Sequence, residues 1–283
     1  MEIPQPRRLA VLGVGLLGAS VLRAARARLP GTELAAWSRS AGSREAVRDV
    51  ATAHDNLADA VRDADCVVLA GPVDAMPELL RAAAPALGTD AWVTDVGSTK
   101  RGVHAAAAAA LPRPGRFVGG HPMAGSERGG AAEGRADLLV GRPCIVTADR
   151  RTDADLPGQA EALWTALGAK VVHLTPEAHD EAVAAISHLP HATACALAHL
   201  LAGGQPRLEL AAGGLRDTTR VAAGDPNLWL PILLENADHL IPLLAGLEQY
   251  AARLRATLAS RDTAALRAYL ESARAFRQRL DRP

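Results

Sequence analysis

The chain has 283 residues and carries 31 Lys or Arg against 31 Asp or Glu, so its formal charge is zero. This balance gives no electrostatic reason to expect a nucleic acid or an anionic membrane as a partner. An apolar content of 49% is typical of a globular protein, and the length allows one large domain or two ordinary ones.

The first residues lack the basic segment and apolar run of a secretion signal, and no apolar run reaches membrane-spanning length. Cys66, Cys144 and Cys195 lie far apart among apolar residues and form no metal-type pair. We therefore expect reduced buried thiols, no metal site and a soluble cytoplasmic protein.

Short apolar runs alternate with helical stretches from Arg8 to about Leu174. The predicted strands are 9–13, 33–37, 66–71, 91–97, 116–120, 143–148 and 170–174. The predicted helices between them include 17–28, 44–50, 57–62 and 159–167. Because the apolar runs are continuous, both faces of the strands should be covered. The pattern predicts an α/β domain over residues 1–175, built on a Rossmann-type, doubly wound parallel sheet.

Residues 176–283 are predicted to form an all-α domain, because apolar residues recur there at helical spacing. Asp225 and Asp262 are each followed by a helix start and should be N-caps. An antiparallel helix pair is expected over 239–281. Its heptad-like seam consists of Leu240, Leu244, Leu247, Ala251, Leu254 and Leu258. This seam indicates a homodimer through the C-terminal helices, although it could instead pack on the first domain.

The segment GVGLLG, residues 13–18, fits G-x-G-x-x-G directly after the first predicted strand. Its glycines permit a tight turn, close approach of a pyrophosphate and close helix–strand packing, and the following helix presents free N–H groups to phosphate. The residues assigned to a dinucleotide site are Gly13, Gly15, Leu16, Leu17, Gly18, Gly71 and Pro72.

The end of the second predicted strand indicates which dinucleotide is bound. Proteins that prefer NAD usually place an acidic residue there, whereas this chain has Ser38-Arg39-Ser40 with Arg44 nearby. A guanidinium and two hydroxyls would bind a 2′-phosphate. We therefore expect NADP to be preferred, with NAD still possible; the alternative is an ordinary solvated turn.

Two further segments should meet at the carboxyl edge of the sheet, where open α/β sheets bind ligands. TDVGSTK (94–100) ends a strand and places Ser98 at the start of the next helix. GGHPMAGSE (119–127) follows another predicted strand and should bring His121 to the same edge. The glycines and proline around His121 exclude a helix and predict a poor strand.

Two more segments lie in the helical half. SHLPH (187–191) places His188 and His191 on one helix face. GGLRDTTRVAAGDPNLW (213–229) carries Asp217, Arg220 and Trp229 into a helix start.

Together, GVGLLGAS, DVGSTK, GGHPMAGSE with HDEAVAAISHLPH, and DTTRVAAGDPNLW resemble the prephenate and arogenate dehydrogenase family of tyrosine biosynthesis. The resemblance runs from the glycine motif through the helical half. It implies oxidative decarboxylation of a cyclohexadienyl acid, prephenate or arogenate, with hydride transfer to NAD(P). No residue decides between the keto and amino substrates.

The resemblance also implies roles for individual residues. His121 would be the base that accepts the hydroxyl proton, with Ser98 as the hydrogen-bonding partner at that hydroxyl. His191 would be a second imidazole in contact with the substrate, and Arg220 would bind a substrate carboxylate. The remaining substrate-binding residues implied are Glu127, Asp217 and Trp229.

Structural roles remain open for several of these residues. Ser98 could cap a helix without contacting the substrate, and Arg220 could pair with Asp217. Trp229 could be a packing residue outside the site. His188 is more simply a buried helix histidine, and His179-Asp180 indicates a helix cap. Two rival functions are another NAD(P)-dependent hydroxyacid dehydrogenase, for which a lysine base in the helical half is missing, and a catalytically silent dinucleotide sensor.

Overall fold

A computed structural model describes residues 5–125, 129–204 and 206–280 of the chain. They fall into two compact units, Met1–Asn236 and Ala237–Pro283. The predicted boundary at residue 175, between a dinucleotide-binding domain and a helical domain for substrate binding and dimerisation, stays a prediction.

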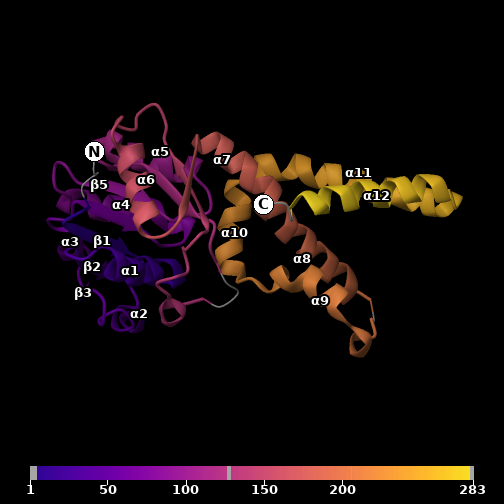
Figure 1. The fold of residues 1–283 in the computed structure, drawn as a ribbon, viewed down its shortest axis with the longest axis horizontal. Coiled ribbons are helices and arrows are strands. Elements are labelled where there is room, and N and C mark those ends of the chain that lie inside the picture. Colours follow the sequence, from indigo (N-terminus) through magenta and orange to yellow (C-terminus); the bar gives the residue numbers. More distant parts are fainter. Residues whose placement is uncertain (1–4, 126–128, 205, 281–283) are drawn as a thin grey trace. The chain divides into compact units, whose positions relative to one another are not determined.

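A five-stranded parallel sheet forms the centre of the first unit (Figure 1). Its strands are β1 (Arg8–Leu12), β2 (Glu33–Trp37), β3 (Thr52–His54), β4 (Cys66–Leu69) and β5 (Trp92–Asp95), in the order β3-β2-β1-β4-β5. This agrees with the predicted Rossmann-type sheet. The sequence pattern missed only β3 in this sheet, because three half-exposed edge residues make no apolar run.

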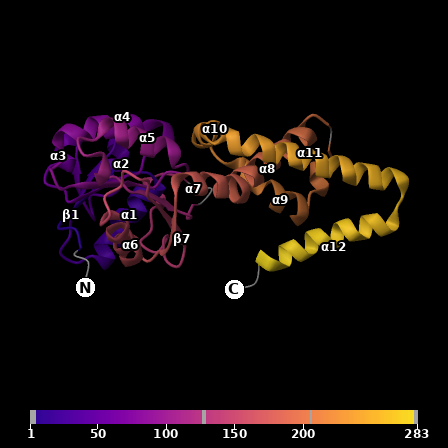
Figure 2. The same cartoon turned by 90° about the horizontal axis from the view of Figure 1, so that it is seen from above.

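Helices cover both faces of this sheet (Figure 2). One face carries α1 (Leu16–Arg28) and α6 (Leu156–Ala166); the other carries α3 (Leu57–Val61), α4 (Met76–Ala83) and α5 (Arg101–Ala110). A short helix, α2 (Ala41–Glu45), follows β2, whereas the sequence predicted a helix over 44–50. Alternate residues of β1 enter the two cores, as the pleat of a strand requires.

A second sheet consists of β6 (Gly119–Pro122), β7 (Pro143–Thr147) and β8 (Lys170–Leu174). Strand β6 is antiparallel to β7, with His121 opposite Ile145, and β7 is parallel to β8. The expectation of one all-parallel sheet was therefore wrong for β6. The predicted strand 116–120 begins three residues later and includes His121 itself.

The rest of the first unit is helical, as predicted. It comprises α7 (Pro176–Val183), a π-helical turn (Ala184–His188), α8 (Leu189–Ala202), α9 (Gly213–Thr219) and α10 (Pro226–Glu235). Short 3₁₀ turns occur at Val73–Ala75, Ala84–Ala86, Pro114–Arg116, Ala131–Glu133, Leu208–Leu210 and Arg220–Ala223. Asp225 caps α10 as predicted, since its Oδ1 accepts a hydrogen bond of 2.9 Å from the N–H of Asn227.

The second unit contains α11 (Ala237–Ser260) and α12 (Thr263–Leu280), which run in opposite directions as predicted. The chain reverses at Arg261, whose φ is 52°, and Asp262 Oδ1 accepts from the N–H of Ala265 at 2.9 Å. Leu247 and Leu258 in the predicted seam are exposed, and so are Leu270 and Phe276 of α12.

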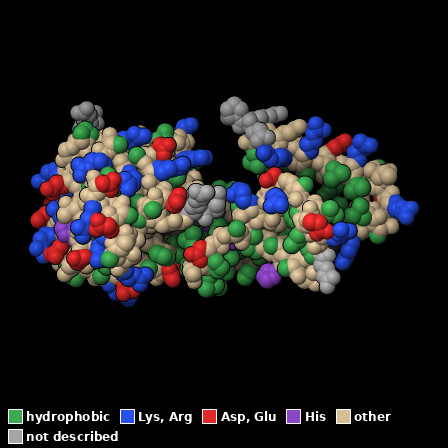
Figure 3. Space-filling model, turned by 90° about the horizontal axis from the view of Figure 1, so that it is seen from below, with side chains coloured by type: hydrophobic (Ala, Val, Ile, Leu, Met, Phe, Trp, Pro, Cys, Tyr) green, Lys and Arg blue, Asp and Glu red, His purple; other side chains and the backbone are tan. Residues whose placement is uncertain are grey.

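Charged side chains of both signs are interspersed over the α/β part in the face drawn in Figure 3. No helix among the described residues is by itself long and apolar enough to cross a membrane.

Candidate active site

The glycine-rich turn between β1 and α1 requires glycine at Gly13. Its φ is +100°, and a Cβ there would lie 2.7 Å from backbone atoms of Ala70 and Gly71. The Gly13 N–H donates to the carbonyl of Trp37 at 2.8 Å, which ties the turn to the end of β2. The turn thus joins the ends of three adjacent parallel strands, β1, β2 and β4.

The same turn leaves room for a ligand at the N-terminus of α1. A Cβ on Gly15 would meet no described atom within 4 Å, and no side chain caps the helix there. Leu16 and Leu17 are half-buried in the first helical turn, which has no acidic residue. Open space, uncapped N–H groups and a positive helix dipole suit a pyrophosphate, so these residues fit a dinucleotide.

Ser38, Arg39 and Ser40 follow β2 beside this turn. The Ser40 hydroxyl accepts from the N–H of Ser43 at 3.2 Å and so caps α2. Arg44 is already engaged, since its guanidinium donates to the Ser38 carbonyl at 2.6 Å and pairs with Asp55 at 2.7 Å. Arg39 is exposed, and no hydrogen bond or ion pair to its side chain occurs in the described ranges.

A buried ion pair lies where β5 ends. The side chains of Lys100 and Asp95 are completely buried and bonded to each other. Lys100 Nζ also donates to the carbonyl of Gly120 at 2.7 Å, while Asp95 Oδ1 accepts from the N–H of Gly120 at 3.1 Å. The pair therefore holds both backbone groups of the residue next to His121.

Close packing explains the glycines before His121. A Cβ on Gly120 would lie 2.6 Å from the Asp95 carbonyl oxygen and 3.0 Å from the Trp164 ring. The prediction that this segment makes a poor strand was wrong, because glycine here fits a narrow space between elements rather than loosening the chain.

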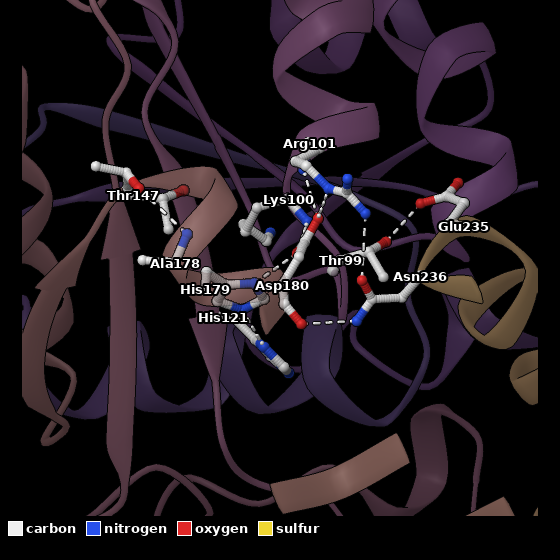
Figure 4. A network of polar contacts seen from close by, with 12 residues as sticks. Thr99, Lys100, Arg101, His121, Thr147, Ala178, His179, Asp180, Glu235 and Asn236 are labelled. Atoms are coloured by element: carbon white, nitrogen blue, oxygen red, sulfur yellow. Dashed lines mark hydrogen bonds and ion pairs between the residues drawn. The ribbon is translucent and has the colours of Figure 1, made fainter. Parts of the chain in front are cut away.

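His121 begins a chain of polar contacts that ends at α5 (Figure 4). Its Nδ1 lies 2.8 Å from Nε2 of His179, and His179 Nδ1 lies 2.8 Å from Oδ1 of Asp180. Asp180 accepts from the backbone N–H groups of Lys100 at 2.7 Å and Arg101 at 3.0 Å. Arg101 Nε adds a further bond to Asp180 at 3.1 Å.

Burial, with smaller effects from the charges of His179 and Lys100, lowers the pKa of His121 well below 6.5. Burial also lowers the pKa of His179. For Asp180, burial alone would raise the pKa, but hydrogen bonds from His179 and the α5 backbone outweigh it and lower the pKa to about 2. At neutral pH the site therefore holds two neutral imidazoles and one carboxylate.

Asn236, directly after α10, joins that helix to α7 and to the π-helical turn beside this network. Its amide nitrogen donates to the Asp180 carbonyl at 2.7 Å and to His188 Nδ1 at 3.1 Å. Glu235 accepts from the Thr99 hydroxyl at 2.5 Å, so the end of α10 contacts the start of α5. His188 is buried, and its burial lowers its pKa to about 4, as suits a structural histidine.

The structure brings two of the predicted substrate residues together. His191 and Trp229 stack with ring centroids 3.6 Å apart and an interplanar angle of 8°. His191 is buried, and its Nδ1 has no hydrogen-bond partner among the described residues. Arg220 and Asp217 are exposed, and within the described ranges no ion pair joins them, so the predicted alternative of internal pairing is absent there. Glu127 lies outside the described residues.

Ser98 is half-buried between β5 and α5. The helix begins at Arg101, three residues later than predicted. No hydrogen bond between Ser98 and His121 occurs in the part of the chain that the structure describes. Gly71 is half-buried and Pro72 exposed beyond β4, next to the Gly13 turn.

Sequence reasoning missed the roles of His179 and Asp180. The interpretation of this pair as a helix cap was wrong: Thr175 caps α7, and both residues lie buried inside that helix. An adjacent His and Asp that both fall on the buried side of an amphipathic helix were the available signal, because buried polar groups need partners. Among the described residues no three His, Cys, Asp or Glu side chains are grouped to hold a metal.

Comparison with known proteins agrees with this geometry. Residues 21–173 match the family model described as prephenate dehydrogenase, nucleotide-binding domain, and residues 175–272 match prephenate dehydrogenase, dimerization domain. The chain belongs to the prephenate dehydrogenase family. The resemblance inferred from the sequence is therefore confirmed, together with the Rossmann-type fold followed by helices and the assignment to NAD(P)-dependent oxidoreductases.

Individual family members are similar over most of their length. The chain is 37% identical over 268 residues to a cyclohexadienyl dehydrogenase of Zymomonas mobilis, covering 90% of each protein. It is 31% identical over 280 residues to a prephenate dehydrogenase of Bacillus subtilis, covering 96% of this chain and 76% of that one.

Solved structures give the same result. Prephenate dehydrogenase from A. aeolicus, in complex with hydroxyphenyl propionate and NAD+, superposes with a TM-score of 0.92 at 28% identity, covering 99% of this chain and 100% of the other. Synechocystis arogenate dehydrogenase superposes with a TM-score of 0.82 at 29% identity, covering 96% and 99%.

Proposed function

We propose that the protein oxidises and decarboxylates a cyclohexadienyl acid, prephenate or arogenate, with NADP preferred over NAD. The products are 4-hydroxyphenylpyruvate from prephenate or tyrosine from arogenate. The observation that carries the proposal is His121, a buried imidazole of lowered pKa held by a polar network at the end of β5. Family membership supplies the substrate class.

The reaction needs a proton acceptor at the ring hydroxyl, and a neutral imidazole is suited to that role near pH 7. A bound nicotinamide would supply the hydride acceptor for the ring carbon that carries this hydroxyl. His121 takes the hydroxyl proton, and the bond to the ring carboxylate then breaks, so that its electron pair makes the ring aromatic and CO2 leaves. The ring oxygen regains a proton, so no net proton is released.

The dinucleotide would be held by the turn at Gly13, Gly15 and Gly18, with Leu16 and Leu17 in the first turn of α1. Gly71 and Pro72 would line the same edge beyond β4. Arg39 supports a preference for NADP, because an exposed guanidinium without a partner among the described residues can pair with a 2′-phosphate.

Further side chains would orient the substrate. Arg220 is exposed and carries no described ion pair, which leaves its guanidinium available for a substrate carboxylate. His191, stacked on Trp229, would contact the substrate with a ring whose orientation is fixed. Ser98, Asp217 and Glu127 are proposed as polar contacts on the strength of the family resemblance alone.

We further propose a cytoplasmic homodimer that forms through α11 and α12. The exposed apolar residues of these helices and the match to a dimerization domain support this. The direct test of the function is a matrix of prephenate and arogenate against NADP and NAD, followed by the absorbance of reduced nicotinamide. Absence of reduction in all four mixtures would refute the proposed activity.

A further inference from the structure

The hydrogen bonds around Asp180 have a fixed direction. Its carboxylate receives two backbone N–H groups from the start of α5 and the Nε–H of Arg101. The pKa of about 2 keeps this group ionised at neutral pH. An ionised carboxylate can only accept hydrogen bonds. Whatever lies 2.8 Å from its Oδ1 must therefore donate.

That donor is His179, whose Nδ1 must carry a proton. His179 is fully buried, and its pKa is lowered by burial, so at neutral pH the ring carries one proton only. Its Nε2 is therefore unprotonated and acts as an acceptor.

The same reasoning reaches His121. Its Nδ1 lies 2.8 Å from the unprotonated Nε2 of His179, so Nδ1 of His121 must donate. In the neutral ring the other nitrogen, Nε2, then holds a lone pair. No residue within the described ranges hydrogen-bonds to this Nε2.

We infer that Asp180, acting through His179, is a positioning residue that fixes His121 in the tautomer whose Nε2 accepts a proton. The inference rests on the proposed function only in giving His121 the role of base. Asp180 need not gain a proton or touch the substrate. It sets the direction of two consecutive hydrogen bonds, and the start of α5 holds its carboxylate in place.

Asp180→Asn is the most informative variant, because it preserves the shape of the side chain while reversing the direction of its hydrogen bond with His179. In the wild type the Lys100 N–H and His179 both bond to Oδ1, whereas the N–H and Nε–H of Arg101 both bond to Oδ2. The Asn oxygen keeps the most hydrogen bonds at the Oδ2 position, where it accepts both bonds from Arg101. The NH2 group then takes the Oδ1 position and gives up the bond from the Lys100 N–H. This NH2 group would donate to His179 Nδ1, which moves the proton of His179 to Nε2. His179 would donate to His121 Nδ1, and Nε2 of His121 would carry the proton and could accept none.

His179→Gln is the matched variant with the opposite expectation. The Gln amide can donate to the unchanged Asp180 carboxylate, and its oxygen can accept from Nδ1 of His121. The tautomer of His121 should therefore be retained. Asp180 still accepts the N–H groups of Lys100 and Arg101 in this variant, so a loss of folding in Asp180→Asn would not leave the inference untested.

The test is 15N NMR of the full-length protein labelled at histidine, with the His121 signals assigned by their loss in His121→Asn. The wild type and His179→Gln should show a protonated Nδ1 and an unprotonated Nε2 at His121, and Asp180→Asn should show the reverse. His173→Gln, at an exposed residue of β8, serves as a control that leaves these signals unchanged. A protonated Nε2 in the wild type, or an unchanged tautomer in a folded Asp180→Asn, would overturn the inference.

The NMR result does not require turnover, so its failure is distinct from a failure of the proposed function. If the enzyme turns over prephenate or arogenate, Asp180→Asn should lower kcat by about 10²–10⁴-fold with little change in the KM of the cofactor, as a wrong tautomer does in serine proteases. His179→Gln should lower kcat by no more than about 10-fold, because His121 keeps its tautomer and can still accept the proton. Loss of proton acceptance itself would lower kcat by about 10²–10⁴-fold. Equal losses in the two variants would contradict the inference.

Discussion

Lys100 Nζ lies 2.7 Å from the carbonyl oxygen of Gly120, the residue that precedes His121. The lysine comes from the end of the β5–α5 connection, and Gly120 belongs to β6 of the second sheet. Asp95 binds both Lys100 and the N–H of Gly120, so one buried ion pair joins the two sheets directly beside the proposed base. The position of His121 thus depends on a charge pair that is completely buried.

Lys100→Met should destabilise the protein by about 3–5 kcal/mol, because it leaves the Asp95 carboxylate buried without its cation. Urea unfolding measures this loss. Adding Asp95→Asn should recover part of it, since the unpaired charge is then removed. Lys170→Met, at the exposed other lysine of the chain, should change stability by less than about 0.5 kcal/mol. A double variant less stable than Lys100→Met would contradict this account of the pair.

His121→Asn should lower kcat by about 10²–10⁴-fold, because it removes the proton acceptor. The dissociation constant of NADP, measured by titration without substrate, should change little, since the Gly13 turn is built from other strands. His173→Asn is the surface control and should match the wild type. Comparable losses of turnover and cofactor affinity in His121→Asn would argue for a structural role instead.

Arg39→Ala should weaken NADP binding by about 10–100-fold, the effect of losing hydrogen bonds to a charged group. NAD lacks the 2′-phosphate, so its dissociation constant should be nearly unchanged. Arg48→Ala, at an exposed arginine already paired with Glu45, is a control of equal charge change. A wild type that binds NAD more tightly than NADP would overturn the assigned preference.

The buried histidines make stability depend on pH. Burial lowers the pKa of His104 and of His188 to about 4, so between pH 6.5 and 4 the unfolded chain binds protons that the folded chain does not. Stability therefore falls as the pH falls through this window. Each of the two should contribute a loss of roughly 3 kcal/mol by pH 4. Urea unfolding at pH 7, 5.5 and 4.5 measures the trend, and a constant stability would contradict it.

Leu247→Glu combined with Leu258→Glu should convert a homodimer into a monomer. Both leucines are exposed on α11, and the substitutions would place carboxylates in the proposed apolar interface. Light scattering coupled to size exclusion gives the mass directly. Leu208→Glu, at an exposed leucine of the first unit, should leave the mass unchanged. A monomeric wild type, or a variant that stays dimeric, would refute the proposed interface.

The local parts of the site were predictable from the sequence because they depend on local chemistry. The Gly13 turn follows from a fixed spacing after a strand, and the Asp225 and Asp262 caps follow from one side chain and the next N–H groups. The five-stranded sheet followed from its apolar runs, apart from β3, which buries too little to make one.

Contacts between distant segments could not be read in this way. Gly120 is glycine because Asp95 and Trp164 leave no space for a Cβ, and no local pattern shows that neighbour. For the same reason His179 and Asp180 resembled a cap, although their partners are His121 and the start of α5, 58 and about 80 positions away.

The central claim is that reduction of the dinucleotide and loss of the ring carboxylate belong to one reaction. It is tested most directly by incubating the protein with NADP and a substrate labelled with 13C at the ring carboxylate, while measuring reduced cofactor and labelled CO2 together. We expect one CO2 for each reduced cofactor with prephenate, arogenate or both. Reduction without release of the label, or no reduction with either substrate and either cofactor, would contradict the account.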